Sequence, residues 1–402
     1  MEASLTKKHF IFFLFTLSLF FSFLASAQKV EPIMSNQGNI VTLHSEILKE
    51  DRRIMIYAPK DSANLNLAYP VIYVLDAENH YNLLVELSKF FGRADVEVAP
   101  PMIVVGITNT DRNRDLTPSH SSFDSSGNLD TVAFKNTGGN ESFLRFIRQE
   151  LIPYVNFNYK IKPYRIFAGH SFGGSTAINC LINYPDMFNA YIAISPALWW
   201  DHDYILKLAD ETLKSGSTLS KTFFLSNGDE GRYNKAAFHN TFLTLDSLLE
   251  KRSLQGLDYK FIHYPMEDHN TVPIKSYYDG LRFIYRQWGF SPLSYKEDNF
   301  DNLMKHYKLL SEKFGYTILP EESNINEWGE WLVASSANVS FGLKLLKMNT
   351  INYPSSSKAF AALGEGYSNV GDKQKAIEAY KKAGELNPES REIRTQLREL
   401  QK

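Results

Sequence analysis

The sequence predicts an α/β fold with a mostly parallel, doubly wound sheet, followed by a small all-helical region. From about residue 69 to residue 290, short apolar stretches alternate with stretches at helical spacing. This alternation is typical of parallel βαβ units with helices on both faces of a sheet. After Pro292 the strand-like stretches stop, and a charged helical pattern with an internal repeat begins. A chain of 402 residues has room for one large domain and one smaller one.

The predicted strands and helices follow one another at short intervals. Residues 39–59 alternate and turn, which indicates antiparallel opening strands. Later strands are expected at 69–75, 102–107, 164–168, 191–195, 222–225 and 259–263, and helices at 83–91, 140–154, up to about 183, 236–251 and 276–288. In such sheets ligands bind beyond the carboxyl ends of the strands, so polar residues at those ends are the candidate site residues.

Residues 1–27 have the pattern of a signal peptide. Lys7 and Lys8 precede an apolar run from Phe10 to Leu24, and Ala25-Ser26-Ala27 follows. This is a charged region, an apolar region and a cleavage site, and we expect cleavage after Ala27. The apolar run is shorter than the ~20 residues that span a bilayer, which favours a cleaved signal over an uncleaved anchor. No membrane span is therefore expected after cleavage.

Composition narrows the class of protein. A net charge of -2 gives no indication of binding to nucleic acid or to an anionic membrane surface. Cys180 is the one cysteine, so no intrachain disulfide can form. Export without disulfides favours a bacterial protein that is periplasmic or secreted.

The stretch from Arg165 to Ala177 contains Gly-x-Ser-x-Gly between a short apolar strand and an apolar-faced helix. This context is typical of the nucleophile elbow of an α/β-hydrolase. The turn is so tight that side chains at Gly169 and Gly173 would collide with neighbouring backbone. The Ser171 hydroxyl then lies at a helix N-terminus, where developing negative charge is favoured. The sequence therefore predicts an α/β-hydrolase fold with Ser171 as the nucleophile.

A serine nucleophile needs a base and an acid that orients the base, and in this fold the chain order is serine, acid, histidine. His269 lies in the loop after the last predicted strand and is the candidate base. His263 falls within that strand, and His170 is a neighbour within the elbow. Asp229 and Glu230 both follow the strand at 222–225, and we favour Glu230 as the acid while leaving Asp229 open.

An oxyanion hole needs two backbone N–H donors. The residue after the nucleophile, Phe172, is expected to supply one. The other is expected from the turn after the strand at 69–75, where we assign Ala77, with Glu78 close behind. This chemistry requires no cofactor.

Two further segments are candidates for the substrate pocket. Trp199 and Trp200 follow the strand after the elbow and would form an aromatic wall, with core packing an equal alternative for one of them. Arg112, with Arg114 and Asp115, follows another strand end. These arginines would bind an anionic substrate group or form an internal ion pair, and the internal pair is favoured.

No metal site is expected. Asp201-His202-Asp203 has metal-ligand residue types, but the spacing is not that of a recognisable site. A helix N-terminus with capping acids is the favoured interpretation of this tripeptide.

The region from residue 293 to residue 402 contains tetratricopeptide-like spacing. Residues 357–390 match one unit, and residues 323–356 form a degenerate preceding unit. We expect residues 391–402 to be a capping helix and the whole region to pack on the domain formed by residues 28–292. Binding of a protein partner and a plain helical hairpin are both open.

The chain resembles the putative esterase family that includes esterase D (S-formylglutathione hydrolase) and the enterochelin esterases. The resemblance runs from about Ile40 to Phe290 and is carried by Tyr69-Pro70, Leu75-Asp76, Val105-Gly106-Ile107, Asn109 to Pro118, Gly169 to Gly174, Ser195 to Trp200, and His269. It is strongest to exported bacterial members with a tetratricopeptide-like tail. The family has an acid in the turn from Gly228 to Gly231, and the Asp229-Glu230 doublet leaves its identity open.

The resemblance implies a carboxylic ester hydrolase that acts on a small-molecule ester. Siderophore, feruloyl, acetyl-sugar and thioester substrates all remain open. The alternative is a non-catalytic hydrolase scaffold that binds a protein partner through its helical tail. A peptidase of the same fold ranks below both.

Overall fold

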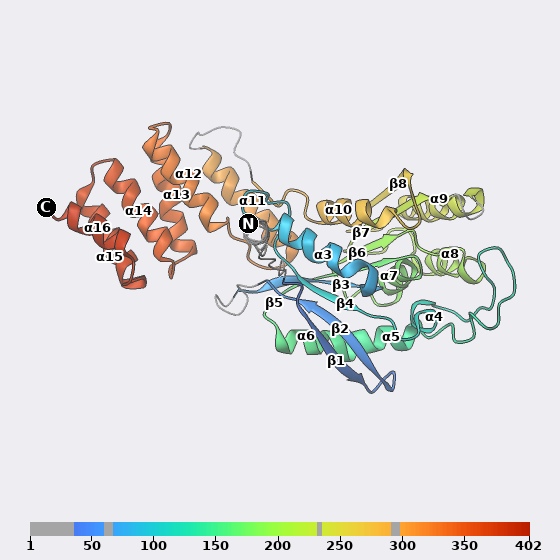
Figure 1. Cartoon of the computed structure of the whole chain (residues 1–402). Helices are drawn as coiled ribbons and strands as arrows, with labels where there is room; N and C mark the ends of the chain where they lie inside the picture. Colours follow the sequence, from blue (N-terminus) through green and yellow to red (C-terminus); the bar gives the residue numbers. More distant parts are fainter. Residues whose placement is uncertain (1–35, 60–66, 231–234, 291–297) are drawn as a thin grey trace, which may run out of the picture. The chain divides into compact units, whose positions relative to one another are not determined.

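In the computed structural model, eight strands of the described chain form one sheet in the order β1-β2-β4-β3-β5-β6-β7-β8 (Figure 1). The structure describes residues 36–59, 67–230, 235–290 and 298–402. The predicted signal peptide at 1–27 and the predicted domain boundary after residue 292 lie outside these ranges. The strands are β1 (Asn39–Ser45), β2 (Glu50–Tyr57), β3 (Tyr69–Val74), β4 (Ile103–Ile107), β5 (Ile161–His170), β6 (Ala190–Ile194), β7 (Thr222–Asp229) and β8 (Asp258–Asp268).

The first part of the sheet is antiparallel and the rest is parallel. β2 pairs antiparallel with both β1 and β4, whereas the pairs from β4 through β8 are all parallel. The predicted α/β-hydrolase sheet with antiparallel opening strands is thereby confirmed. The carboxyl ends of β3, β5, β7 and β8 lie along one edge of the sheet, as parallel pairing requires.

Helices connect the strands and cover both faces of the sheet (Figure 1). They are α3 (Ala77–Phe91), α4 (Arg112–Leu116), α5 (Asn140–Phe146), the π-helical turn η1 (Ile147–Leu151), α6 (Ile152–Asn158), α7 (Phe172–Asn183), α8 (Trp200–Thr212), α9 (Lys235–Arg252) and α10 (Val272–Ile284). The predicted amphipathic helix at 140–154 is thus a longer helical segment with a π turn in its middle.

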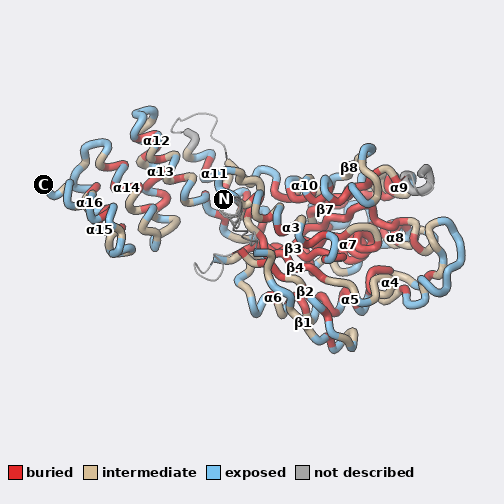
Figure 2. The backbone as a smooth tube through the Cα atoms, viewed as in Figure 1, coloured by how far each residue is buried: buried red, intermediate tan, exposed pale blue. Residues whose placement is uncertain are grey.

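Alternate residues of each central strand enter the two apolar layers. In β3, Val71 and Tyr73 join the layer under α5–α9, whereas Ile72 and Val74 join the layer under α3 and α10. All four side chains are fully buried, which explains why the central strands have continuous apolar sequences. Figure 2 shows the buried residues concentrated along these strands.

Two elements near the site differ from the sequence prediction. The helix expected at 83–91 begins six residues earlier, at Ala77, so its N-terminus lies at the carboxyl end of β3. The last strand, expected to end at 263, continues to Asp268 as β8. This extension carries the strand pairing to the residue directly before the candidate base, His269.

The region after residue 297 is all helical, as predicted. Its helices are α11 (Asp298–Phe314), α12 (Glu322–Ala334), α13 (Val339–Asn352), α14 (Ser357–Asn369), α15 (Lys373–Leu386) and α16 (Arg391–Leu400). The two predicted repeat units are each occupied by a pair of helices, and α16 follows them. Their assignment to tetratricopeptide repeats, and any partner, stay predictions.

α11 packs against the layer of α3 and α10. Phe314 stacks on Tyr285 with ring centroids 5.1 Å apart and meets Tyr164 edge-on at 4.8 Å. Lys313 Nζ donates a hydrogen bond of 3.0 Å to the carbonyl of Ile284, at the end of α10. The first tail helix therefore completes the apolar layer that begins under the sheet.

Candidate active site

Ser171 lies in a strained turn between β5 and α7. Its backbone has φ 59 and ψ -121, a conformation that non-glycine residues adopt at a cost of about 1–3 kcal/mol. A side chain at Gly169 would collide with the carbonyl oxygen of Gly173. At Gly173 itself the constraint is milder, because an added Cβ would lie 3.3 Å from Leu75. The turn is tied to β6 by a 2.9 Å hydrogen bond from Ser171 N to the Ile194 carbonyl.

His269 and Glu230 come together across the ends of β7 and β8. His269 Nδ1 donates a 2.8 Å hydrogen bond to Glu230 Oε2. The Glu230 side chain is nearly inaccessible, at 3% exposure, while that of His269 is 22% exposed. Asp229 is the last residue of β7 and lies opposite Asp268 in the ladder. The geometry therefore favours Glu230 over Asp229 as the residue that orients His269.

The predicted oxyanion donors are the first residues of two helices. Phe172 begins α7 and Ala77 begins α3. The first N–H groups of a helix have no partner within it, and the helix dipole makes that end electropositive. Two such helix ends at the same sheet edge provide donors suited to an oxyanion. Glu78, the alternative donor, follows directly in α3, and its carboxylate accepts a 2.8 Å hydrogen bond from Asn109 N.

Arg112 makes an internal ion pair, as favoured from the sequence, and its partner is Asp76. Its guanidinium donates to both carboxylate oxygens of Asp76, at 2.6 and 2.9 Å. Asn109 Nδ2 donates to the same carboxylate at 2.7 Å. Asp76 is buried and has a left-handed backbone, with φ 52 and ψ 49, directly before Ala77. The pair therefore holds the turn that presents the Ala77 N–H.

The same guanidinium reaches the other half of the predicted oxyanion hole. It lies 5.5 Å from the centre of the Phe172 ring, within cation–π distance. Arg112 is therefore engaged on two sides by the protein itself. Arg114, the second arginine of this segment, pairs with Glu50 at 2.6 Å and with Asp115 at 2.7 Å.

The two tryptophans have different surroundings. Trp200 is fully buried, packs edge-on against Phe134 at 5.3 Å and donates from Nε1 to the Ser119 carbonyl. We therefore reassign Trp200 from the pocket wall to the core. Trp199 is half-buried and lies 5.9 Å from Phe172, so it remains the candidate aromatic wall.

The Asp201–Asp203 tripeptide is not a capped helix start. Its three residues have left-handed φ values of 47, 53 and 63, and no side chain caps α8. Within the described ranges, no three His, Cys, Asp or Glu side chains come together in a way that could hold a metal ion.

Sequence reasoning quoted Asp76 and Asn109 only among the residues that carry the family resemblance, and it gave neither of them, nor His170, a role in the site. Asp76 follows a buried strand end, which is the signal that selected the other candidates. Its partner Arg112 is 36 residues away, so only the fold brings the two together. The imidazole of His170 lies 4.5 Å from that of His269 between ring centroids.

The geometry agrees with comparisons with known proteins. A family model described as "Putative esterase" matches residues 45–269, more than half of the chain. The chain belongs to this esterase family. Over 235 residues it is 30% identical to the ferri-bacillibactin esterase BesA of Bacillus subtilis (strain 168). This alignment covers 56% of this chain and 81% of the relative.

Solved structures give the same assignment. An IroE-like serine hydrolase from Shewanella oneidensis superposes with a TM-score of 0.70 at 28% identity, covering 78% of this esterase and 99% of that protein. The BES protein from Bacillus cereus gives a TM-score of 0.54 at 25% identity, covering 66% and 100%. The chain is thus an enzyme, a serine esterase. The comparisons give no support to the alternative of a non-catalytic scaffold.

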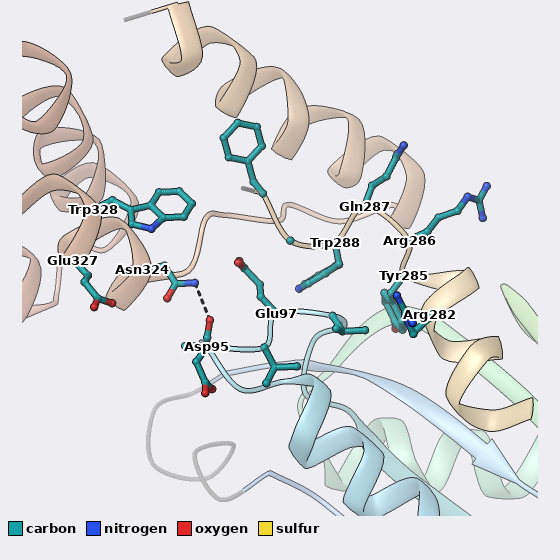
Figure 3. Close-up of a pocket in the computed structure, with 15 residues that line it drawn as sticks. Asp95, Glu97, Arg282, Tyr285, Arg286, Gln287, Trp288, Asn324, Glu327 and Trp328 are labelled. Carbon is teal, nitrogen blue, oxygen red and sulfur yellow. Dashed lines mark hydrogen bonds between the residues drawn. The ribbon is translucent and has the colours of Figure 1, made fainter. Parts of the chain in front are cut away.

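None of the helices in the described ranges combines the length and the apolar character that crossing a bilayer requires. A cavity of 630 Å³ lies at the far end of α3, lined by residues 94–98, by Arg282 and residues 285–290, and by residues of α12 (Figure 3). Because α3 runs for 15 residues from Ala77, or about 22 Å, this cavity is remote from Ser171.

Glu97 lies in the middle of this cavity, between Trp288 and Asn324 (Figure 3). Burial and the neighbouring carboxylate of Glu321 raise the pKa of Glu97 to about 7. The folded state therefore binds a proton that the unfolded chain releases at lower pH, and stability falls as the pH rises from about 4.5 to 7.

Glu97→Gln is expected to raise the melting temperature at pH 8 by about 2 °C, because it removes a negative charge that burial disfavours. The rise is small because Glu97 is partly exposed and solvent screens its charge, and no change is expected at pH 4.5. Differential scanning calorimetry at the two pH values measures this. Glu327→Gln, an exposed carboxylate on the same cavity, is the matched control and should show no pH-dependent difference. An equal shift of the Glu97 variant at both pH values would contradict the expectation.

Proposed function

We propose that this esterase cleaves its substrate through an acyl-enzyme formed on Ser171, with His269 as the base and Glu230 as the orienting acid. The observation that carries the proposal is the 2.8 Å hydrogen bond between His269 and Glu230 beside the strained Ser171 turn. With Nδ1 occupied by Glu230, the His269 ring has Nε2 as the atom that takes a proton.

In the first half of the reaction, Ser171 Oγ attacks the ester carbonyl carbon and its proton passes to His269 Nε2. Glu230 stabilises the imidazolium that forms. The negative charge moves to the carbonyl oxygen, where the N–H groups of Phe172 and Ala77 (or Glu78) stabilise it. His269 then gives its proton to the departing alcohol, and the acyl group stays on Ser171.

In the second half, water attacks the acyl-enzyme and gives a proton to His269. The second tetrahedral intermediate is stabilised by the same two N–H groups. It collapses with return of the proton to Ser171 Oγ, which releases the carboxylic acid. Every proton transfer in the two halves passes through His269.

We propose siderophore esters as the substrate class. The support is the relationship to the bacillibactin esterase, of which this chain covers 81%. The half-buried Trp199 beside Phe172 offers an aromatic wall for a ring next to the scissile ester. Feruloyl, acetyl-sugar and thioester substrates are the competing outcomes.

The test has two arms. A fluorophosphonate probe is expected to modify the protein once, with the adduct mapped by mass spectrometry to the peptide carrying Ser171. A panel of siderophore, feruloyl, acetyl-sugar and thioester substrates should give its highest kcat/KM for the siderophore esters. Labelling elsewhere contradicts the nucleophile assignment, and a preference for another class contradicts only the substrate assignment.

We also propose that the protein is exported, on the basis of the pattern in residues 1–27. In a bacterial expression host, the mature protein is expected to begin at Gln28 and to be found in the periplasm or medium. N-terminal sequencing of the cytoplasmic and exported fractions measures this. Intact protein confined to the cytoplasm would contradict it.

A further inference from the structure

A row of rings extends from His269 into the protein. The His170 ring lies 4.5 Å from that of His269, with an angle of 45° between the ring planes. On its other side, His170 meets His80 edge-on at 5.6 Å, and His80 meets Tyr277 at 5.4 Å. The row therefore links the elbow, α3 and α10 directly behind the proposed base.

The far end of the row is rigidly held. Tyr277 is completely buried, with 0% accessibility, and His80 is 7% accessible. His80 lies in the first turn of α3, three residues after Ala77, where its N–H approaches the Asp76 carbonyl at 3.3 Å. The rings behind His170 thus have little freedom to move, and they fix the position of the His170 ring.

His170 contacts His269 through its ring. Burial, together with the nearby His269, His80 and Arg112, lowers the pKa of His170 well below its ordinary value. His170 is therefore neutral when His269 becomes charged, so the two rings do not repel each other.

The ring contact with His170 restrains a motion of the His269 ring that its hydrogen bond to Glu230 leaves free. The hydrogen bond from Nδ1 to Glu230 fixes one edge of the ring, but a single hydrogen bond leaves the ring free to tilt about it. We propose that His170 is a positioning residue that packs against the face of His269 and holds Nε2 toward Ser171. This inference rests on the proposed triad and adds to it a residue that sequence order had classed as a neighbour.

The physical consequence is a cost in rate and not in binding. A reacting group displaced by about 1 Å can lose about 100-fold in rate. His170→Ala is therefore expected to lower kcat by about 10- to 100-fold with KM unchanged.

His170→Phe separates ring packing from other roles. Phenylalanine keeps an aromatic ring against His269 and is expected to recover most of the lost rate. It also keeps the space filled, so it tests the proposal if His170→Ala fails to fold. The matched control is His306→Ala, which removes a histidine ring 5.2 Å from Phe290, away from Ser171, and should stay within about twofold of wild type.

The experiment measures kcat and KM of each variant on one aryl ester, with Ser171→Ala in parallel. A His170→Ala enzyme with wild-type kcat would overturn the proposal, and so would a loss confined to KM. A Phe variant as slow as the Ala variant, both folded, would also overturn it. If Ser171→Ala retains activity, the proposed nucleophile fails instead, which keeps the two failures distinct.

Discussion

Ser171→Ala is expected to lower kcat/KM for ester substrates by about 10⁴- to 10⁶-fold and to abolish fluorophosphonate labelling. The hydroxyl is the one group at the elbow that can form the acyl-enzyme, and nothing at position 171 replaces it. The Phe172 and Ala77 donors remain, so a small residual rate above that of water is expected. Steady-state kinetics on an activated aryl ester measure the loss.

The matched control for this variant is Ser175→Ala. Ser175 lies one helical turn further along α7 and is fully buried, with its hydroxyl near the Ser171 carbonyl at 3.5 Å. Its replacement removes a hydroxyl from the same helix without touching the proposed nucleophile, and kcat/KM should stay within about threefold of wild type. Comparable activity in the Ser171 and Ser175 variants would refute the assignment of Ser171.

Glu230→Gln is expected to lower kcat by about 10⁴-fold while KM changes little. The amide keeps the size of the side chain but removes the negative charge that stabilises the imidazolium. It also presents a donor as well as an acceptor to His269 Nδ1, which permits the wrong tautomer. Stopped-flow measurement of acyl-enzyme formation with an aryl ester would show the loss in the chemical step.

Asp229→Asn distinguishes the two adjacent carboxylates. Asp229 lies within the β7–β8 ladder opposite Asp268, and its replacement is expected to lower kcat less than tenfold, an effect of the size of an ordinary substitution. If the Asp229→Asn enzyme lost the larger factor and the Glu230→Gln enzyme stayed active, the triad acid would be Asp229.

Much of the fold was accessible from local pattern. The apolar runs of β3 and β4 are continuous because both faces of these strands are covered by helices. Such runs can be recognised in a single sequence. Two local features could not be predicted, namely the π turn at Ile147–Leu151 and the left-handed backbone at 201–203. Neither segment contains a glycine or proline that would indicate them.

The candidate site also contains residues that the sequence predicts and contacts that only the structure shows. Ser171 and His269 could be selected because each stands at a strand end in a fixed chain order, which is a property of the sequence. Arg112 was correctly expected to form an internal pair, but only the structure identifies its partner as Asp76. Partners separated by 36 positions meet only when parallel strands align their carboxyl ends.

By itself, then, the sequence determined the α/β-hydrolase fold and the short set of candidate residues, because these depend on periodicity and order along the chain, and its motifs carried the resemblance to the esterase family. The tertiary structure decided between neighbours that periodicity treats alike. Adjacent residues point in different directions, so Glu230 meets His269 while Asp229 ends a strand, and Trp200 enters the core while Trp199 stays half-buried. It also placed His170 against His269, a contact between rings 99 positions apart that only the packed sheet edge creates.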